Sequence, residues 1–327
     1  MISRRSFLLG SAVLATVPAL PPLAVPALAE APPKRSGQAP GFFRLEFGDV
    51  EVTALYDGGG AIPQDILHGA PAKDISGLLA DACIDPAAGS PLAINAFLLN
   101  TGANLVLVDT GAGTFFGTRA GLLPANLRAA GYAPEDVDTV LITHLHVDHA
   151  LGLAGADGEA AFPKAVVRVR DADAAYWLDD ALPAKVPEAK KPGLTALRAA
   201  VAPYRSAGTW KPFAAGETPV AGVAAMPLPG HTPGHTGFRV DSQGKSLLLF
   251  GDIIHVAAVQ FPKPSVTIDF DVDQPAARAA RARLMAQAVK ECWTIGGAHL
   301  PFPGLGRIRP QGQGYAWLPV PYEASRA

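Results

Sequence analysis

Metal-binding side chains are concentrated in one short stretch of this chain, and that stretch constrains the fold more than any other feature. His144, His146, Asp148 and His149 fall within six residues, directly after the apolar segment 139–143. Imidazole and carboxylate groups are the ligands that zinc and similar divalent ions prefer. Residues two apart in an extended backbone face the same side, so His144 and His146 point together while Asp148 and His149 turn away. The spacing predicts a metal site where a buried strand enters a loop, with room for a second ion.

Three further candidate ligands occur later in the chain. His231 lies in a loop rich in glycine and proline, and Asp252 follows the apolar segment 247–250. His299 comes after the last predicted strand. Seven of the eight histidines lie in or beside this set, and only His68 lies elsewhere. Each candidate follows a predicted strand, so we expect the loops to meet at one edge of the fold.

This arrangement resembles the metallo-β-lactamase superfamily, in which His-x-His-x-Asp-His is followed by a single His, a single Asp and a final His. The resemblance implies an α/β fold, a four-layer αββα sandwich, with two metal ions. The implied ligands are His144, His146 and His231 for one ion, Asp148, His149 and His299 for the other, and Asp252 as a bridge. Asp109 matches a position that supports a ligand, and His235 is interpreted as a neighbour of the third histidine rather than as a ligand.

The resemblance also implies a reaction. Two divalent ions, zinc in the first place with manganese, cobalt and iron as alternatives, share a hydroxide that attacks a carbonyl or phosphoryl group. Asp148 or Asp252 would orient this hydroxide or accept its proton, which makes them the predicted catalytic residues. No nucleophile from the protein is needed. The expected function is hydrolysis of a small-molecule ester, lactone or phosphotriester.

More specific motifs are similar to the methyl parathion hydrolase group. They lie at residues 41–44, 52–55, 105–111, 256–261 and 298–304, and this likeness extends from about residue 40 to residue 322. Members of the group hydrolyse organophosphate triesters, aryl esters or lactones at a dinuclear site. Oligomers of such relatives suggest a homodimer, which the composition here merely permits.

The predicted substrate pocket combines matches to that group with departures from it. Phe116 and Trp177 match aromatic pocket positions of the phosphotriesterase. The departures are His255 and Phe270, where the phosphotriesterase pattern has aliphatic side chains, and Ile268, where it has a threonine. A narrower pocket with one polar wall favours a planar lactone or aryl ester over a tetrahedral triester. Phosphotriester hydrolysis is the alternative, followed by a β-lactamase and by a metal-binding protein without catalysis.

The hydrophobic pattern predicts a chain of strands and helices in mixed order. A β-hairpin is expected over 43–56, and a second strand pair over 94–99 and 105–108. The other predicted strands are 139–143, 166–169, 222–226, 237–240, 246–250 and, as the last one, 292–295. Predicted helices cover 124–131, 172–181, 193–201 and 273–290. We expect one domain over residues 41–327, preceded by a loose lead-in at 30–40.

The N-terminus predicts export. Ser-Arg-Arg-Ser-Phe-Leu at residues 3–8 is a twin-arginine pattern, and an apolar run and a small-residue site follow it. We interpret residues 1–29 as a signal peptide and expect a periplasmic or secreted protein. The apolar run is shorter than a membrane span of about 20 residues, so no stable anchor is expected. An uncleaved anchor and an ordinary N-terminus remain the alternatives.

Composition excludes several classes of protein. The chain of 327 residues is 49% hydrophobic and carries a formal net charge of −2, which excludes a disordered chain and a basic surface for nucleic acid. Two cysteines are too few for a disulfide-stapled scaffold. Cys83 and Cys292 either pair or stay free, and the apolar surroundings of Cys292 predict a buried thiol.

Overall fold

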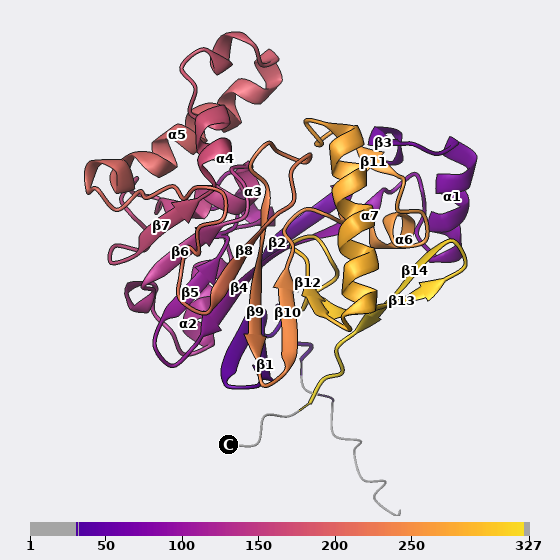
Figure 1. The fold of residues 1–327 in the computed structure, drawn as a ribbon, viewed down its shortest axis with the longest axis horizontal. Helices are drawn as coiled ribbons and strands as arrows, with labels where there is room; N and C mark the ends of the chain where they lie inside the picture. Colours follow the sequence, from indigo (N-terminus) through magenta and orange to yellow (C-terminus); the bar gives the residue numbers. More distant parts are fainter. Residues whose placement is uncertain (1–30, 32, 324–327) are drawn as a thin grey trace, which may run out of the picture. The chain divides into compact units, whose positions relative to one another are not determined.

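Two six-stranded sheets lie at the centre of the computed structural model (Figure 1), which describes residues 31 and 33–323. The predicted signal peptide lies outside the described residues, and contacts divide the chain at Gln38, so the description below concerns the unit from Ala39 onward. The first sheet has the order β1-β2-β4-β5-β6-β7 and the second β14-β13-β12-β10-β9-β8.

The strands of the first sheet are β1 (Phe42–Phe47), β2 (Val50–Ile62), β4 (Ser90–Asn100), β5 (Leu105–Val108), β6 (Thr139–Ile142) and β7 (Val166–Val169). Those of the second are β8 (Val223–Pro227), β9 (Thr236–Ser242), β10 (Lys245–Leu249), β12 (Thr294–Gly296), β13 (Leu305–Gln311) and β14 (Gly314–Pro319). Two short strands, β3 (Leu67–His68) and β11 (Thr267–Ile268), pair with each other.

The helices are α1 (Ala72–Asp81), α2 (Leu123–Ala129), α3 (Val147–Ala150), α4 (Asp171–Trp177), α5 (Lys191–Ser206), α6 (Ala257–Gln260) and α7 (Gln274–Lys290). Short 3₁₀ turns are η1 (Gln64–Ile66), η2 (Gly117–Arg119), η3 (Pro134–Asp136), η4 (Leu151–Leu153), η5 (Leu182–Ala184) and η6 (Glu188–Lys190). Within the described residues, no helix combines the length and the apolar character needed to cross a bilayer.

Alternation along the strands produces the layers. In β4 and β5, Phe97 and Val106 face the second sheet and pack with Phe238 of β9 in the core between the sheets. Their neighbours Leu98 and Leu107 face the other way and pack against the helices α2 and α5. On the outer face of the second sheet, α7 covers β10 and β12 with its apolar side. The predicted four-layer αββα architecture is confirmed.

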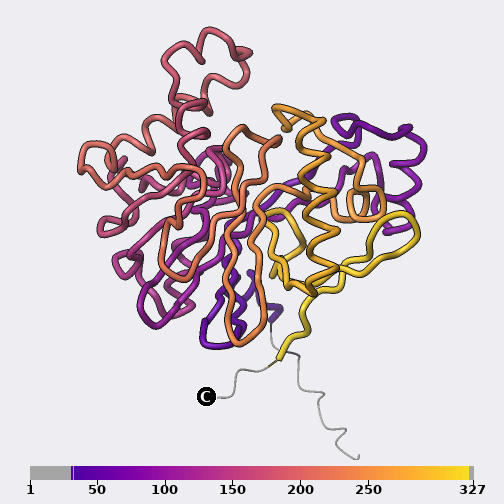
Figure 2. Tube along the Cα trace, viewed as in Figure 1, coloured from indigo at the N-terminus to yellow at the C-terminus, as the bar shows by residue number. Residues whose placement is uncertain are grey.

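Segments far apart in the sequence lie side by side in this arrangement (Figure 2). The turn between β1 and β2 contacts the turn between β9 and β10, where the backbone N–H of Asp49 donates to Ser242 Oγ at 2.8 Å. The amide of Gln243 also donates to the Asp49 carboxylate, at 2.7 Å. These contacts fix the two sheets against each other at the edge opposite the loops that follow β6 and β10.

Most predicted elements are confirmed, and the differences have local causes. Residues 292–295 do not hold the last strand, because β12 is followed by the hairpin of β13 and β14. Pro310 near the end of β13 and two glycines in the turn disguise this hairpin, since proline is uncommon inside strands. Helix α1, which was not predicted, buries only Ile75 and Leu79. Helix α4 already ends at Trp177, short of the predicted 181.

The prediction that Cys292 is buried is wrong. Both Cys83 and Cys292 are free and exposed. Each takes a left-handed backbone conformation just after a helix, with φ of 57° for Cys83 and 54° for Cys292. The tight turn from α7 into β12 leaves the Cys292 side chain on the surface, so the apolar sequence around it does not report its own burial.

Candidate metal centre

Loops from both sheets bring the predicted ligands together at one edge of the sandwich. Strands β5 and β6 run parallel, as do β10 and β12, so in each sheet the chain leaves both strands at the same end. The ligand positions are His144 and His146 after β6, Asp148 and His149 in α3, His231 before β9, Asp252 after β10 and His299 after β12. All seven predicted ligands fall in one connected group of side chains.

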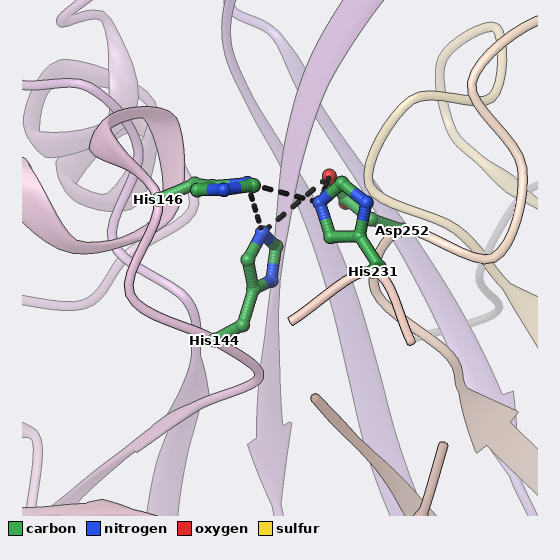
Figure 3. Close-up of side chains that lie close together, drawn as sticks. All are labelled: His144, His146, His231 and Asp252. Carbon is green, nitrogen blue, oxygen red and sulfur yellow. Dashed lines mark hydrogen bonds and ion pairs between the residues drawn. The ribbon is translucent and has the colours of Figure 1, made fainter. Parts of the chain in front are cut away.

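Four of these side chains form a first cluster (Figure 3). His146 Nδ1 lies 3.0 Å from His144 Nε2 and 2.9 Å from His231 Nε2. Asp252 Oδ2 lies 3.5 Å from His144 Nε2 and 3.2 Å from His231 Nε2. In a tetrahedral zinc site with bonds of about 2.0–2.1 Å, neighbouring ligand atoms are about 3.4 Å apart. The spacing of the first cluster is therefore that of a metal site.

A second cluster lies on the other side of Asp252. His149 Nε2 lies 3.2 Å from Asp252 Oδ1 and 3.9 Å from Asp148 Oδ1. His299 Nε2 lies 3.0 Å from Asp252 Oδ2 and 3.6 Å from Asp148 Oδ2. Both clusters thus meet at the carboxylate of Asp252, which is the arrangement expected of a bridging ligand.

Asp109 orients His149. Asp109 Oδ2 accepts a hydrogen bond from His149 Nδ1 at 2.8 Å, which leaves Nε2 directed at the cluster. The same carboxylate accepts from the backbone N–H and the hydroxyl of Thr143, both at 2.8 Å. Asp109 itself has a left-handed φ of 62°, a costly conformation for a residue other than glycine. Its three hydrogen bonds hold that conformation in place.

Two other histidines are oriented in the same way. His231 Nδ1 donates to Asp271 Oδ1 at 2.8 Å, and His299 Nδ1 donates to the carbonyl of Ala93 at 2.8 Å. In each ring the remaining nitrogen, Nε2, faces Asp252. Such outer hydrogen bonds fix the tautomer of a metal-binding imidazole.

Unpaired buried atoms test whether these residues fit a metal. His149 Nε2 and Asp252 Oδ1 are both buried and, among the described residues, neither has a hydrogen-bond partner, although they lie 3.2 Å apart. A buried polar atom without a partner costs about 1–3 kcal/mol. A cation between them accepts an electron pair from each and removes that cost. The donor set, imidazole nitrogens with carboxylate oxygens, fits divalent zinc or a similar ion.

The protonation of the first cluster also suits metal binding. Burial, together with neighbouring imidazoles, holds the pKa of His144 and of His146 well below the usual value, so both rings are neutral. Burial acts to lower the pKa of His231 as well, but its hydrogen bonds with Asp252 and Asp271 raise that pKa to about 9. Burial acts to raise the pKa of Asp252, yet the facing imidazoles, His149 first, hold it well below its usual value. The carboxylates therefore require positive charge at the centre, from protons or from metal.

His235 supports Asp252 without being free to bind an ion. Its Nε2 accepts from the backbone N–H of Asp252 at 3.0 Å, and its Nδ1 donates to the carbonyl of Leu228 at 3.0 Å. The intervening Gly251 has a φ of 58°, and a Cβ there would lie 2.6 Å from His235 Nε2. Only glycine fits this close approach, which sets the direction of the Asp252 carboxylate.

Sequence reasoning missed two buried carboxylates. Asp173 accepts from the backbone N–H of Leu145 at 2.7 Å and of Gly234 at 3.0 Å, and so ties the loops that carry the first cluster to each other. Asp271, which orients His231, is the other. Neither lies in a motif with its histidine partners, and only the folded chain brings them near, so no signal in the sequence identifies them.

A cavity of about 440 Å³ opens beside both clusters. Of the predicted pocket residues, Phe116, Trp177, His255 and Phe270 line it. Further lining residues that the sequence did not identify include Phe115, Leu194 and Leu197. The metal-cluster residues that reach the cavity are His146, Asp148, Asp252 and His299. The site is thus a mostly apolar pocket with the clusters on one wall.

The prediction that Ile268 belongs to the pocket is wrong. Ile268 is completely buried and packs with Leu67, Ile75 and Val266 in a core cluster beneath α1. The pairing of β11 with β3 turns its side chain into that core, whereas Phe270, two residues later, lies 42% exposed at the cavity.

Comparisons with solved structures agree with this architecture. A hydrolase of the β-lactamase superfamily called AbOPH is 36% identical to this chain, with a TM-score of 0.84 over 88% of this chain and 100% of its own. AidC, a dizinc quorum-quenching lactonase in complex with a product, N-hexanoyl-L-homoserine, is 25% identical. Its TM-score is 0.80 over 87% of this chain and 99% of its own.

Comparisons of sequence identify the family. Probable metallo-hydrolases of Mycobacterium tuberculosis and Mycobacterium bovis are each 32% identical over 190 residues, or 51% of this chain. The chain spans 58% of the length of these curated relatives. The sequence pattern of the metallo-β-lactamase superfamily matches residues 89–303, which include all seven predicted ligands. This chain belongs to the metallo-β-lactamase superfamily.

Proposed function

We propose that this protein is a hydrolase with two divalent metal ions that opens lactones or cleaves aryl esters. The observation that carries the proposal is the position of Asp252, which both ligand clusters share at the wall of an apolar cavity. His144, His146 and His231 would hold one ion with Asp252, and Asp148, His149 and His299 would hold the other. Zinc is the first candidate, since it accepts this set of nitrogen and oxygen ligands.

Each part of the site has a role in this proposal. The two ions, when bound, supply Lewis acidity and lower the pKa of water near 7. Asp148 lines the cavity with 17% of its side chain exposed, so its carboxylate can accept or return a proton at the substrate. Asp252 is almost fully buried and contributes by keeping the two clusters in register.

The cavity supports a substrate with a flat reacting group and an apolar arm. Trp177 lies edge-on to His146, with 5.1 Å between ring centroids, and therefore places an aromatic wall directly beside the first cluster. Phe115 and Phe116 contact each other at 5.3 Å on the opposite lining segment. His255 and Phe270 narrow the remaining wall. A planar carbonyl needs less room between such walls than a tetrahedral phosphorus with three substituents.

Similar proteins support the same choice of substrate class. AidC binds a product of lactone opening, and its fold matches nearly all of this chain. Phosphotriester hydrolysis is the second candidate function, because Phe116 and Trp177 both line the cavity where the methyl parathion hydrolase resemblance expects them.

A panel of substrates tests the proposal. The zinc-loaded or manganese-loaded protein is assayed with dihydrocoumarin, an aryl acetate, a methyl phosphotriester and nitrocefin, and kcat/KM is compared. We expect the largest value for the lactone or the aryl ester. A phosphotriester turned over far faster than dihydrocoumarin would establish the second candidate instead. Full metal content with no turnover of any substrate would mean that the site binds metal without catalysis.

A further inference from the structure

More imidazole groups surround Asp252 Oδ2 than hydrogen bonding can explain. The Nε2 atoms of four histidines approach this one oxygen: His299 at 3.0 Å, His231 and His255 at 3.2 Å each, and His144 at 3.5 Å. A carboxylate oxygen has about two lone-pair sites, so at most two of the four can donate to it. Three of these histidines are expected metal ligands. The fourth, His255, was expected only as a residue of the pocket wall.

His255 has the surroundings of a ligand. Its side chain is 1% exposed, and its ring stacks on that of His299 with 5.1 Å between centroids and 23° between planes. Its other nitrogen, Nδ1, is buried and has no hydrogen-bond partner among the described residues. With Asp252 and His299 it forms a group of three donor atoms that all lie within 4.8 Å of one another. These are the features that the predicted ligands share.

The backbone that carries His255 is held in place by buried side chains. Gln260 Oε1 accepts from the backbone N–H of His255 at 2.7 Å and of Val256 at 3.0 Å. Arg281, 1% exposed, reaches from α7 and donates to the carbonyl of Ile253 at 2.6 Å. A ring fixed on both sides of its own residue keeps one orientation, as a ligand requires.

We propose that His255 is an eighth metal ligand, which acts with Asp252 and His299 on the ion of the second cluster. The proposal rests on the dinuclear centre proposed above and adds a neutral nitrogen to its second site. It predicts that this site holds its ion more tightly than Asp148, His149, His299 and Asp252 would alone. It also explains why a polar imidazole is buried in the wall of an otherwise apolar cavity.

Metal binding by matched variants tests this assignment. His255→Leu and His255→Gln are compared with the wild-type protein and with His68→Gln, which changes an exposed histidine on β3. Zinc content is measured by elemental analysis and zinc affinity by competition with a chelator. The Co(II) forms are then compared by visible absorption and by the paramagnetically shifted imidazole N–H signals in proton NMR. Circular dichroism confirms that each variant is folded.

The outcomes separate the new assignment from the proposed function. We expect the wild-type and His68→Gln proteins to bind two ions. Both His255 variants are expected to bind one of the two ions about tenfold more weakly or worse, with altered Co(II) bands and one imidazole signal fewer. Two ions bound with unchanged affinity and spectra in His255→Leu would overturn the assignment. So would wild-type binding in His255→Gln, since glutamine keeps a hydrogen bond to Asp252 but is a poor ligand. A wild-type protein that binds no metal would instead refute the proposed function.

Discussion

At the scale of single residues, the site depends on carboxylates that have two tasks at once. Asp252 faces both clusters, while its backbone N–H is held by His235. Asp109 and Asp271 each accept a proton from the far side of a histidine ring and so present Nε2 to the centre. Removing any of these groups leaves buried imidazoles without a partner, and the loss therefore exceeds one contact.

Replacing Asp252 with alanine should cost metal and activity together. Outer residues of a metal site are worth about 10–100-fold in affinity or rate, and a ligand shared by two clusters is worth more. We expect Asp252→Ala to lose at least one ion per chain and to retain less than about 1% of the wild-type kcat/KM. Elemental analysis and a lactone assay measure both, with circular dichroism as the check on folding. Unchanged metal content with unchanged rate would contradict the bridging assignment.

The role of Asp271 can be isolated with a matched neighbour. Asp271→Asn removes the charge that faces His231 Nδ1, whereas Asp269→Asn alters an exposed carboxylate two residues earlier that pairs with His68. We expect the first variant to weaken zinc binding about 10–100-fold and the second to leave it unchanged. Chelator competition measures the two affinities. Equal affinities in Asp271→Asn and the wild type would mean that Asp271 does not orient His231 for metal.

At the scale of elements, helix α5 shows how the scaffold around the pocket is fixed. The hydroxyl of Tyr204 in α5 donates to the carbonyl of Leu153 at 2.9 Å and accepts from the backbone N–H of Phe162 at 3.0 Å. The side chain is 1% exposed, so both backbone groups depend on it. Leu194 and Leu197 on the same helix line the cavity, and Tyr204 therefore anchors one of its walls.

A change of Tyr204 to phenylalanine should destabilise the fold without affecting the metal site. It leaves the two backbone partners unpaired, at a cost of about 1–3 kcal/mol in the free energy of unfolding. Burial raises the pKa of Tyr204 to about 12, against 10.0 for an ordinary tyrosine. The unfolded tyrosine ionises first as pH rises, so this contribution is complete below pH 10 and is lost towards pH 12.

Urea unfolding at several pH values measures both effects. The difference in stability between the wild type and Tyr204→Phe should shrink between pH 10 and pH 12. Tyr322→Phe, at a residue 85% exposed, is the control and should match the wild type throughout. A difference for Tyr204→Phe that is constant over this range would contradict the buried hydrogen bonds described here.

The elements also show what a sequence can and cannot predict. The strands that end at the ligands are short apolar runs, so their positions follow from hydrophobicity, and the spacing of the histidines marks one rim. The orientation of Ile268 depends on the pairing of β11 with β3, which no local pattern reveals. Asp173 and Asp271 act on partners 28 and 40 residues away. Such contacts arise only when the loops of both sheets meet.

At the scale of the whole molecule, the centre links the two halves of the sandwich. His144 and His149 follow β6 of the first sheet, and Asp252 and His299 follow β10 and β12 of the second. Because the ligand groups come together only in the folded chain, metal binding adds to the free energy of folding. Export through the predicted signal and assembly into a homodimer remain predictions about the protein as a whole.

Thermal unfolding tests this link between the halves. Ligand at 1,000 times its dissociation constant stabilises the native state by about 4 kcal/mol. We therefore expect the zinc-loaded protein to unfold at a clearly higher temperature than the chelator-treated protein, in one transition. Asp252→Ala should show a smaller shift on addition of zinc. An identical midpoint with and without zinc would mean that the clusters do not bind it in the native state.

The number of metal ions per chain tests the central claim most directly. Protein stripped with a chelator, reloaded with zinc and freed of excess metal is analysed for zinc and for protein concentration. The shared position of Asp252 between two ligand clusters predicts two ions per chain, with lactone or ester hydrolysis lost on stripping and restored on reloading. One ion per chain, or none, would contradict the dinuclear centre.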